Sequence, residues 1–113
     1  MSAVYVSNLV INTGEDFSQQ FTLQNADDNG PLDLTDYTVA SQIRKHAGSS
    51  TATDFTIDIS LPRTLGRISV KLTNSQTNSL KPGRYLYDIV LTRSGTKTKV
   101  VEGMVLVRQG VTR

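Results

Sequence analysis

Apolar residues recur at every second position in six stretches of this chain, and that period of two is the feature that most constrains its fold. Alternation of this kind puts apolar side chains on one face of an extended strand, whereas a helix needs a period of about 3.6. The clearest stretch alternates Phe55, Ile57, Ile59 and Leu61 with polar residues. The others lie at 17–24, 39–44, 68–72, 85–91 and 97–108, and an apolar N-terminal segment, Val4 to Ile11, adds one more. We therefore expect about seven strands.

The residues between these stretches favour turns, with one exception. Ser94-Gly95 predicts a tight hairpin between the two longest strands, and Arg63–Gly66 predicts a short connection. Thr73 is followed three residues later by Gln76, which is the spacing of a capping box, so we expect one short helix around 73–80. Strands at regular spacing with one small helix predict an all-β fold, an antiparallel β-sandwich.

The last stretch differs from the others because it carries apolar residues on both faces. Alternation places Val101, Gly103, Val105 and Val107 on one face, and Val100, Glu102, Met104 and Leu106 on the other. Such a strand is central in its sheet, or its second face is covered by a partner.

Length and composition limit the domain organisation. A chain of 113 residues forms one core, so we expect a single domain spanning 1–113. The absence of cysteine and the presence of one histidine exclude disulfides, thiolate zinc sites and multi-histidine metal sites. No apolar run approaches the roughly 18–20 residues of a membrane span, and no signal peptide is recognisable. We expect a soluble protein, and the start at Met1 without a linker predicts a stand-alone subunit.

The two halves of the chain carry opposite charge. Residues 1–58 hold eight acidic and two basic residues, a net charge of −6, whereas residues 59–113 hold ten basic and two acidic residues, a net charge of +8. Either the charges interleave on a solvated surface once the strands pair, or an acidic edge of one copy faces a basic edge of the next. The overall charge of +2 is too small to indicate nucleic-acid binding.

The string Pro82-Gly83-Arg84-Tyr85 indicates a particular corner. In immunoglobulin-like sandwiches a tyrosine at the start of a strand follows a sharp corner, and its hydroxyl bonds to the backbone upstream. Gly83 suits the turn, and Tyr85 supplies the ring and the hydroxyl at that spacing. Tyr87 stands where antibody domains place a bridging cysteine, so we expect ring packing there instead of a disulfide. These residues predict an immunoglobulin-like sandwich with a structural corner at Gly83 and Tyr85; the alternative is that Tyr85 is an ordinary buried strand residue.

No constellation of residues predicts catalysis. His46 lies in a turn without an acid beside it in sequence, and the adjacent pairs Asp27-Asp28 and Glu15-Asp16 splay apart on turns. The glycines are isolated at turns and form no phosphate-binding pattern. Basic residues flank a hairpin without interleaved aromatic residues. We therefore expect no enzymatic activity, cofactor, small-molecule substrate, nucleic acid or membrane partner.

One acidic turn has a spacing similar to that of a calcium-binding loop. Asn25, Asp27, Asn29 and Asp36 offer oxygen ligands at comparable intervals. However, the first position is asparagine, the last is aspartate rather than a bidentate glutamate, and no helices are expected to flank the turn. We expect an ordinary turn without a metal, with calcium binding as the alternative.

Several strings together resemble a family of phage proteins. Pro31–Thr38, Ser41–Lys45, Leu72–Thr77, Pro82–Asp88 and Val101–Val107 resemble successive parts of the small immunoglobulin-like virion structural proteins of tailed phages, akin to the N-terminal domain of phage baseplate upper proteins. The resemblance covers residues from about 8 to 108 and departs at position 36, where this chain has aspartate instead of the usual glycine. It implies a virion protein without catalytic residues that positions other proteins.

We therefore expect a structural component of a tailed-phage virion: a tail, baseplate or fibre-attachment protein, made in the host cytoplasm, that contacts other virion proteins and forms a homo-oligomer. The candidate interface consists of apolar residues on the outer side of the C-terminal hairpin: Leu86, Val90, Met104 and Leu106. The alternative is that these residues cover a second face of the same core.

Two other functions are compatible with the same fold. One is a capsid decoration protein. The other is a carbohydrate-binding β-sandwich module, which would present exposed aromatic rings to sugars, and Tyr5 and Tyr37 are its candidates.

Overall fold

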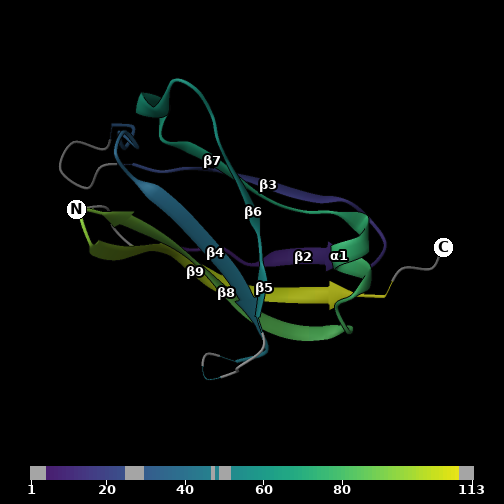
Figure 1. Cartoon of the computed structure of the whole chain (residues 1–113). Helices are drawn as coiled ribbons and strands as arrows, with labels where there is room; N and C mark the ends of the chain where they lie inside the picture. Colours follow the sequence, from purple (N-terminus) through teal and green to yellow (C-terminus); the bar gives the residue numbers. More distant parts are fainter. Residues whose placement is uncertain (1–4, 25–29, 47, 49–51, 110–113) are drawn as a thin grey trace.

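Two β-sheets face each other in this protein, as expected for an all-β sandwich (Figure 1). The computed structural model describes residues 5–24, 30–46, 48 and 52–109. The strands are β1 (Tyr5–Val6), β2 (Leu9–Asn12), β3 (Phe17–Thr22), β4 (Thr38–Arg44), β5 (Ala52–Asp54), β6 (Thr56–Ile59), β7 (Arg67–Leu72), β8 (Gly83–Arg93) and β9 (Thr96–Arg108). A 3-10 helix, η1 (Arg63–Leu65), and one α-helix, α1 (Asn74–Asn78), are the helical elements of the described residues.

The strands form a larger and a smaller sheet. The larger sheet follows the order β1-β9-β8-β4-β5, and β2 continues the line of β1 along β9; the smaller sheet follows the order β3-β7-β6. Neighbouring strands are antiparallel except that β1 and β2 run parallel to β9, so the predicted antiparallel arrangement is corrected at this edge. The chain leaves β2 for the other sheet, and no tight turn joins β2 to β9 to impose an antiparallel direction.

The core lies between the sheets and contains most of the predicted alternating residues; Leu61 of the clearest stretch is the exception, since it lies beyond the end of β6 and is 79% exposed. Ile11, Ile43 and Ile89 of the larger sheet and Ile68 and Val70 of the smaller sheet are at most 1% exposed. Full burial of an aliphatic side chain of this size contributes about 1.5–3 kcal/mol. Burial of these alternating positions is therefore the main source of stability.

Phe55 links the two sheets where the chain crosses from β5 to β6. Its backbone N–H donates to the Ser41 carbonyl at 2.9 Å, which ties the crossing to β4. Its buried ring meets Tyr87 edge-on at 6.2 Å between centroids and meets Phe17 at 6.0 Å in a tilted arrangement. Tyr87 belongs to the larger sheet and Phe17 to the smaller one, so three rings connect the two layers, and the expected ring packing of Tyr87 is present. The short strand β5 was not predicted, because three residues are too few to show alternation.

A β-bulge corrects the predicted faces of the last strand. Ile89 pairs with Val101, whereas its neighbour Val90 pairs with Lys99, so Val100 is an extra residue in β9. Val100 and Val101 are both completely buried. The prediction that Val100 shares the outer face with Glu102 is therefore wrong, because a bulge shifts the alternation by one residue.

The predicted hairpin and helix are both confirmed. Ser94 and Gly95 form the two-residue loop between β8 and β9 with φ angles of 50° and 82°, and such paired positive values match the twist of a hairpin. At the start of α1 the Thr73 hydroxyl accepts from the Gln76 N–H at 3.2 Å, and the Gln76 side-chain oxygen accepts from the Thr73 N–H at 2.8 Å. This reciprocal pair is the predicted capping box.

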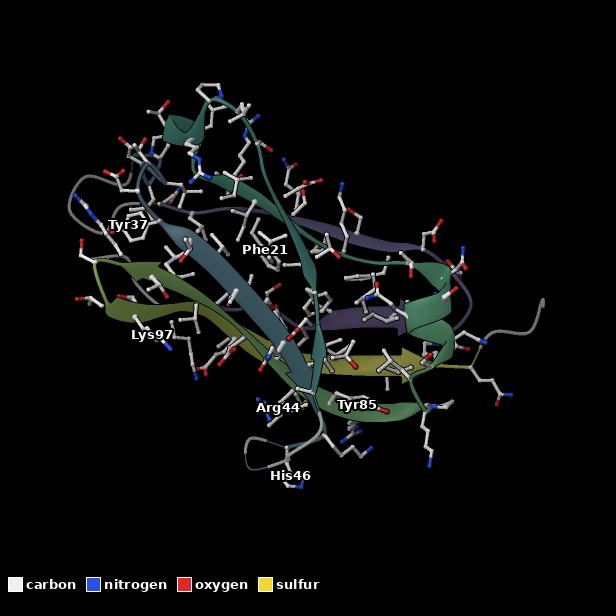
Figure 2. The ribbon with its side chains drawn as sticks, in the orientation of Figure 1. Phe21, Tyr37, Arg44, His46, Tyr85 and Lys97 are labelled. Atoms are coloured by element: carbon white, nitrogen blue, oxygen red, sulfur yellow. The ribbon has the colours of Figure 1, made fainter. Side chains whose placement is uncertain are left out.

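The corner before β8 has the geometry of a tyrosine corner, and its Tyr85 side chain is labelled in Figure 2. The Tyr85 hydroxyl donates to the Lys81 carbonyl at 2.7 Å, four residues upstream. Gly83 has a φ of 146°, a value that side chains disfavour, and a Cβ there would lie 2.9 Å from the Lys45 ammonium nitrogen. That ammonium nitrogen lies 4.8 Å from the centroid of the Tyr85 ring, so glycine leaves room for a cation–π contact.

We predict that Tyr85→Phe lowers the free energy of unfolding by about 1 kcal/mol, because it removes the corner hydrogen bond and keeps the ring. Chemical denaturation monitored by circular dichroism measures this change. Tyr37→Phe is the matched control: Tyr37 is also half-buried, and its hydroxyl bonds to no described residue. Equal losses in the two variants would contradict a stabilising role for the corner hydrogen bond.

Candidate functional site: an apolar docking face

The outer face of the larger sheet exposes a group of large apolar side chains. We call this group the apolar patch; it consists of Val6 (69% exposed), Val10 (51%), Leu86 (40%), Met104 (45%) and Leu106 (43%). The strand register makes them neighbours, since Leu86 pairs with Met104 and Val10 pairs with Leu106. A cluster of exposed apolar residues is typical of a surface that another molecule covers.

The structure brings together three of the four predicted interface residues. Leu86, Met104 and Leu106 lie in the patch, and their exposure shows that they face outward instead of filling the core. Val90 is half-buried and lies farther along β8, beyond Asp88, so it is outside the patch. Sequence analysis missed Val6 and Val10. Their signal is their alternation with the buried residues Leu9 and Ile11.

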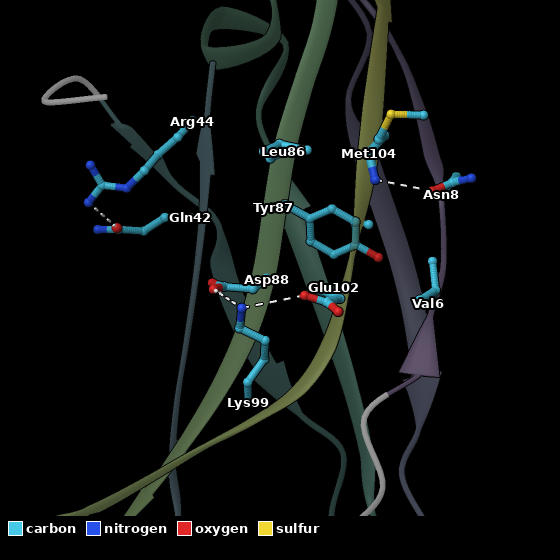
Figure 3. A pocket seen from close by; sticks show the side chains of 11 residues that line it. Val6, Asn8, Gln42, Arg44, Leu86, Tyr87, Asp88, Lys99, Glu102 and Met104 are labelled. Atoms are coloured by element: carbon cyan, nitrogen blue, oxygen red, sulfur yellow. Dashed lines mark hydrogen bonds and ion pairs between the residues drawn. The ribbon is translucent and has the colours of Figure 1, made fainter. Parts of the chain in front are cut away.

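An open groove of about 750 Å³ runs along this face (Figure 3). Its lining combines the apolar side chains Val6, Leu86 and Met104 with polar ones: Asn8, Gln42, Arg44, Asp88, Lys99 and Glu102. We call the groove together with the apolar patch the docking face. Mixed apolar and charged walls favour a large partner over a small enclosed ligand.

A charged triad borders the apolar patch. Asp88 and Glu102 lie opposite each other on β8 and β9, and like charges in this position repel. The Lys99 ammonium nitrogen lies 3.6 Å from the Asp88 carboxylate and 3.4 Å from the Glu102 carboxylate (Figure 3). The β-bulge at Val100 is what turns Lys99 to this face. These pairs are about half exposed, so each contributes at most about 1 kcal/mol and they mainly set the charge pattern.

The N-terminal strand, by which we mean β1 and β2 with Ser7 and Asn8 between them, is held by side-chain hydrogen bonds at Ser7 and Asn8, where its ladder with β9 is interrupted. The Tyr87 hydroxyl donates to the Ser7 carbonyl at 2.5 Å, and the Asn8 side-chain oxygen accepts from the Met104 N–H at 3.1 Å. Gly103 pairs with Tyr87 and lies between β8 and the N-terminal strand. A Cβ at Gly103 would overlap the Ser7 carbonyl oxygen. Glycine at this position is therefore what lets Ser7 approach β9.

The acidic turn lies partly outside the described residues. Asn25, Asp27 and Asn29 are among the residues that are not described, so the expected metal-free turn and its calcium-binding alternative both stay untested there. Asp36 is exposed with a φ of 69°, which is the left-handed region that glycine favours and aspartate tolerates. Within the described residues no group of three or more His, Asp or Glu side chains is placed to hold a metal ion.

Other candidate residues contribute no assembled site. His46 is exposed at the end of β4. The Arg93 guanidinium carbon lies 5.6 Å from the centroid of the half-buried Tyr37 ring. The side chain of Tyr5 is outside the described set. Lys71 pairs with Asp58 at 2.6 Å, so at this point charges of the acidic and basic halves interleave within one molecule.

No helix in the described part of the chain is long and apolar enough to cross a membrane.

Comparisons with known proteins identify fold relatives and no family. No protein-family model matches the chain, and no curated protein matches it in sequence. The crystal structure of Listeria monocytogenes InlP is similar, with a TM-score of 0.51 and 14% identity over 90% of this chain and 26% of that one. The N-terminal domain of phage TP901-1 ORF48 is similar with a TM-score of 0.53 and 10% identity, over 90% of this chain and 85% of that one. The chain thus spans about a quarter of InlP, and it shares its fold with a domain of a phage protein.

We predict that Gly103→Ala lowers the free energy of unfolding by about 1–3 kcal/mol, because the new Cβ displaces the Ser7 carbonyl. Amide hydrogen exchange should also accelerate selectively at residues 6–12. Gly48→Ala is the control, since a Cβ there meets only the His46 ring at 3.8 Å. Unchanged exchange in β1 and β2 would show that Gly103 does not hold the N-terminal strand.

We predict that the Asp33 carboxyl titrates below its ordinary pKa of 3.8. The Thr35 hydroxyl donates to it at 2.6 Å and the Thr35 N–H at 2.9 Å, and both bonds lower the pKa by stabilising the carboxylate. A lowered folded pKa means that this contribution to stability is present above pH 3.8 and is lost as pH falls through the lower folded value. Carboxyl-carbon NMR measures the midpoint. Thr35→Ala should raise it, and a midpoint at or above 3.8 in the parent protein would contradict the prediction.

Proposed function

We propose that this protein is a non-enzymatic structural component of a tailed-phage virion and that it acts through protein–protein contacts at the docking face. The observation that carries the proposal is the apolar patch, in which five large side chains are 40–69% exposed on one face of a well-packed sandwich. Leaving such a patch in water is unfavourable, so a covering surface would stabilise the protein.

The fold likeness supports the phage assignment. This chain and the N-terminal domain of phage TP901-1 ORF48 overlap over 85% of that domain, so the two have similar dimensions as well as similar architecture. The strings that resemble tailed-phage structural modules include Pro82–Asp88 and Val101–Val107, which contribute Leu86, Met104 and Leu106 to the docking face. The finer assignment is a tail, baseplate or fibre-attachment protein; a capsid decoration protein would use the same contact chemistry.

Carbohydrate binding has less support. A sugar platform needs an exposed aromatic face, and Tyr37 packs against the core with a guanidinium near its ring. The docking face is lined by aliphatic, charged and amide side chains, and the one aromatic residue among the described residues that line it, Tyr87, is buried.

Quantitative mass spectrometry of purified phage particles tests the proposal. Particles purified from the strain that encodes the protein should contain it at a fixed copy number relative to the major capsid protein. Detection in the lysate and absence from the particles would refute the proposal.

We further predict that the double substitution Leu86→Lys, Met104→Lys reduces incorporation of the protein into particles at least tenfold, because it places two charges in the apolar patch. Leu61→Lys is the matched control, since Leu61 is 79% exposed and lies outside the patch. Normal incorporation of the double variant would show that the patch is not the contact surface, and binding of the parent protein on a glycan array with absence from particles would favour the carbohydrate alternative.

A further inference from the structure

Along β8 and β9, the charged residues of the docking face change from basic at one end to acidic at the other. On β8 the consecutive outward residues are Arg84, Leu86 and Asp88. On β9 they are Arg108, Leu106, Met104 and Glu102. The register aligns the two strands, since Arg84 pairs with Leu106, Leu86 with Met104, and Asp88 with Glu102. On β8 and β9 the arginines therefore lie at one end and the carboxylates, with Lys99 beside them, at the other; Arg44 of β4 lies next to Leu86, alongside the patch.

This order is self-complementary. We infer that the partner on the docking face is a second copy of this chain, packed sheet against sheet about a two-fold axis that lies in the interface and runs across the strands. The inference rests on the proposed function only in using the same docking face. A two-fold contact presents the same surface from both copies, so the surface must match itself when it is turned over.

An axis across the strands reverses the strand direction and brings bases onto acids. With the axis between Leu106 and Met104, Leu106 of one copy lies over Met104 of the other, and Arg108 lies over Glu102 of the other. Outward residues of a strand are about 6.6–6.8 Å apart, so Arg84 spans the second copy's Leu86 with its aliphatic stem and reaches Asp88. Each base–acid contact therefore occurs twice, once with the base from the first copy and once with the base from the second.

Other orientations lack this match. An axis along the strands keeps the strand direction, so the arginine end of one copy would meet the arginine end of the other. The acidic pair Asp88 and Glu102 would likewise meet its own counterpart, and like-charge contacts oppose association. The charge order thus selects one orientation, while burial of the aliphatic side chains between the sheets supplies the attraction.

The lysine of the charged triad is compatible with this packing. Lys99 lies on the side of Asp88 and Glu102 that points away from the apolar patch. It can keep its contacts while the arginines of the second copy approach the carboxylates from the apolar side. Two carboxylates sharing one lysine retain a negative charge for that approach.

Analytical ultracentrifugation of the full chain tests the inference. We expect a concentration-dependent equilibrium between monomer and dimer, with Met104→Lys shifted to monomer and the control Leu61→Lys unchanged. A monomer at every concentration would overturn the inference. Because particle incorporation is measured separately, a monomer that still enters particles would overturn the two-fold contact and leave the proposed function standing.

A charge-reversal experiment distinguishes the second copy from any other partner. Arg108→Glu and Glu102→Arg should each weaken self-association at least tenfold, since each places like charges in both contacts. An equimolar mixture of the two variants should regain dimers, because every contact in the mixed dimer again joins an acid and a base. Circular dichroism and thermal unfolding verify that both variants are folded. A mixture as dissociated as the separate variants would refute the proposed orientation.

Discussion

The docking face depends on the contact that Tyr87 makes across Gly103. The ring extends from β8 over a residue with no side chain, and its hydroxyl reaches the Ser7 carbonyl at 2.5 Å in the N-terminal strand. The N-terminal strand, β9 and β8 are thereby joined at one level of the sheet, and a side chain at position 103 would separate the N-terminal strand from β9. Val6 and Val10 flank this point, so two of the five residues in the apolar patch are placed by it.

The same tyrosine also belongs to the contact between the layers. Its ring meets Phe55, which meets Phe17, so the larger sheet, the crossing segment and the smaller sheet are joined by ring packing. One side chain thus stabilises the sandwich and fixes the edge strand that completes the outer face. The exposed apolar face is thus held in place by a residue that is itself only 4% exposed.

Sequence reasoning succeeded where the signal is local. The hairpin at Ser94-Gly95, the capping box of Thr73 and Gln76, and the alternation of the core strands all depend on residues close in sequence. It failed where the structure depends on pairing between segments that are far apart in the sequence. The parallel pairing of β1 and β2 with β9 joins residues about 96 positions apart, and no turn signal announces it. For the same reason Leu86, Met104 and Leu106 were found from one hairpin, while Val6 and Val10 were missed.

The bulge at Val100 has a consequence for how such a protein can diverge. Along most of β8 and β9, odd positions face the core and even positions face outward, so outward residues can be exchanged without altering the packed interior. The faces of β9 also depend on where its unpaired residue lies, because pairing Val100 instead of Lys99 with Val90 would turn Thr96–Lys99 over and withdraw the lysine from its two carboxylates. Substitutions on the outward side therefore leave the packed interior intact, whereas a shift of the bulge changes which residues reach the outer face.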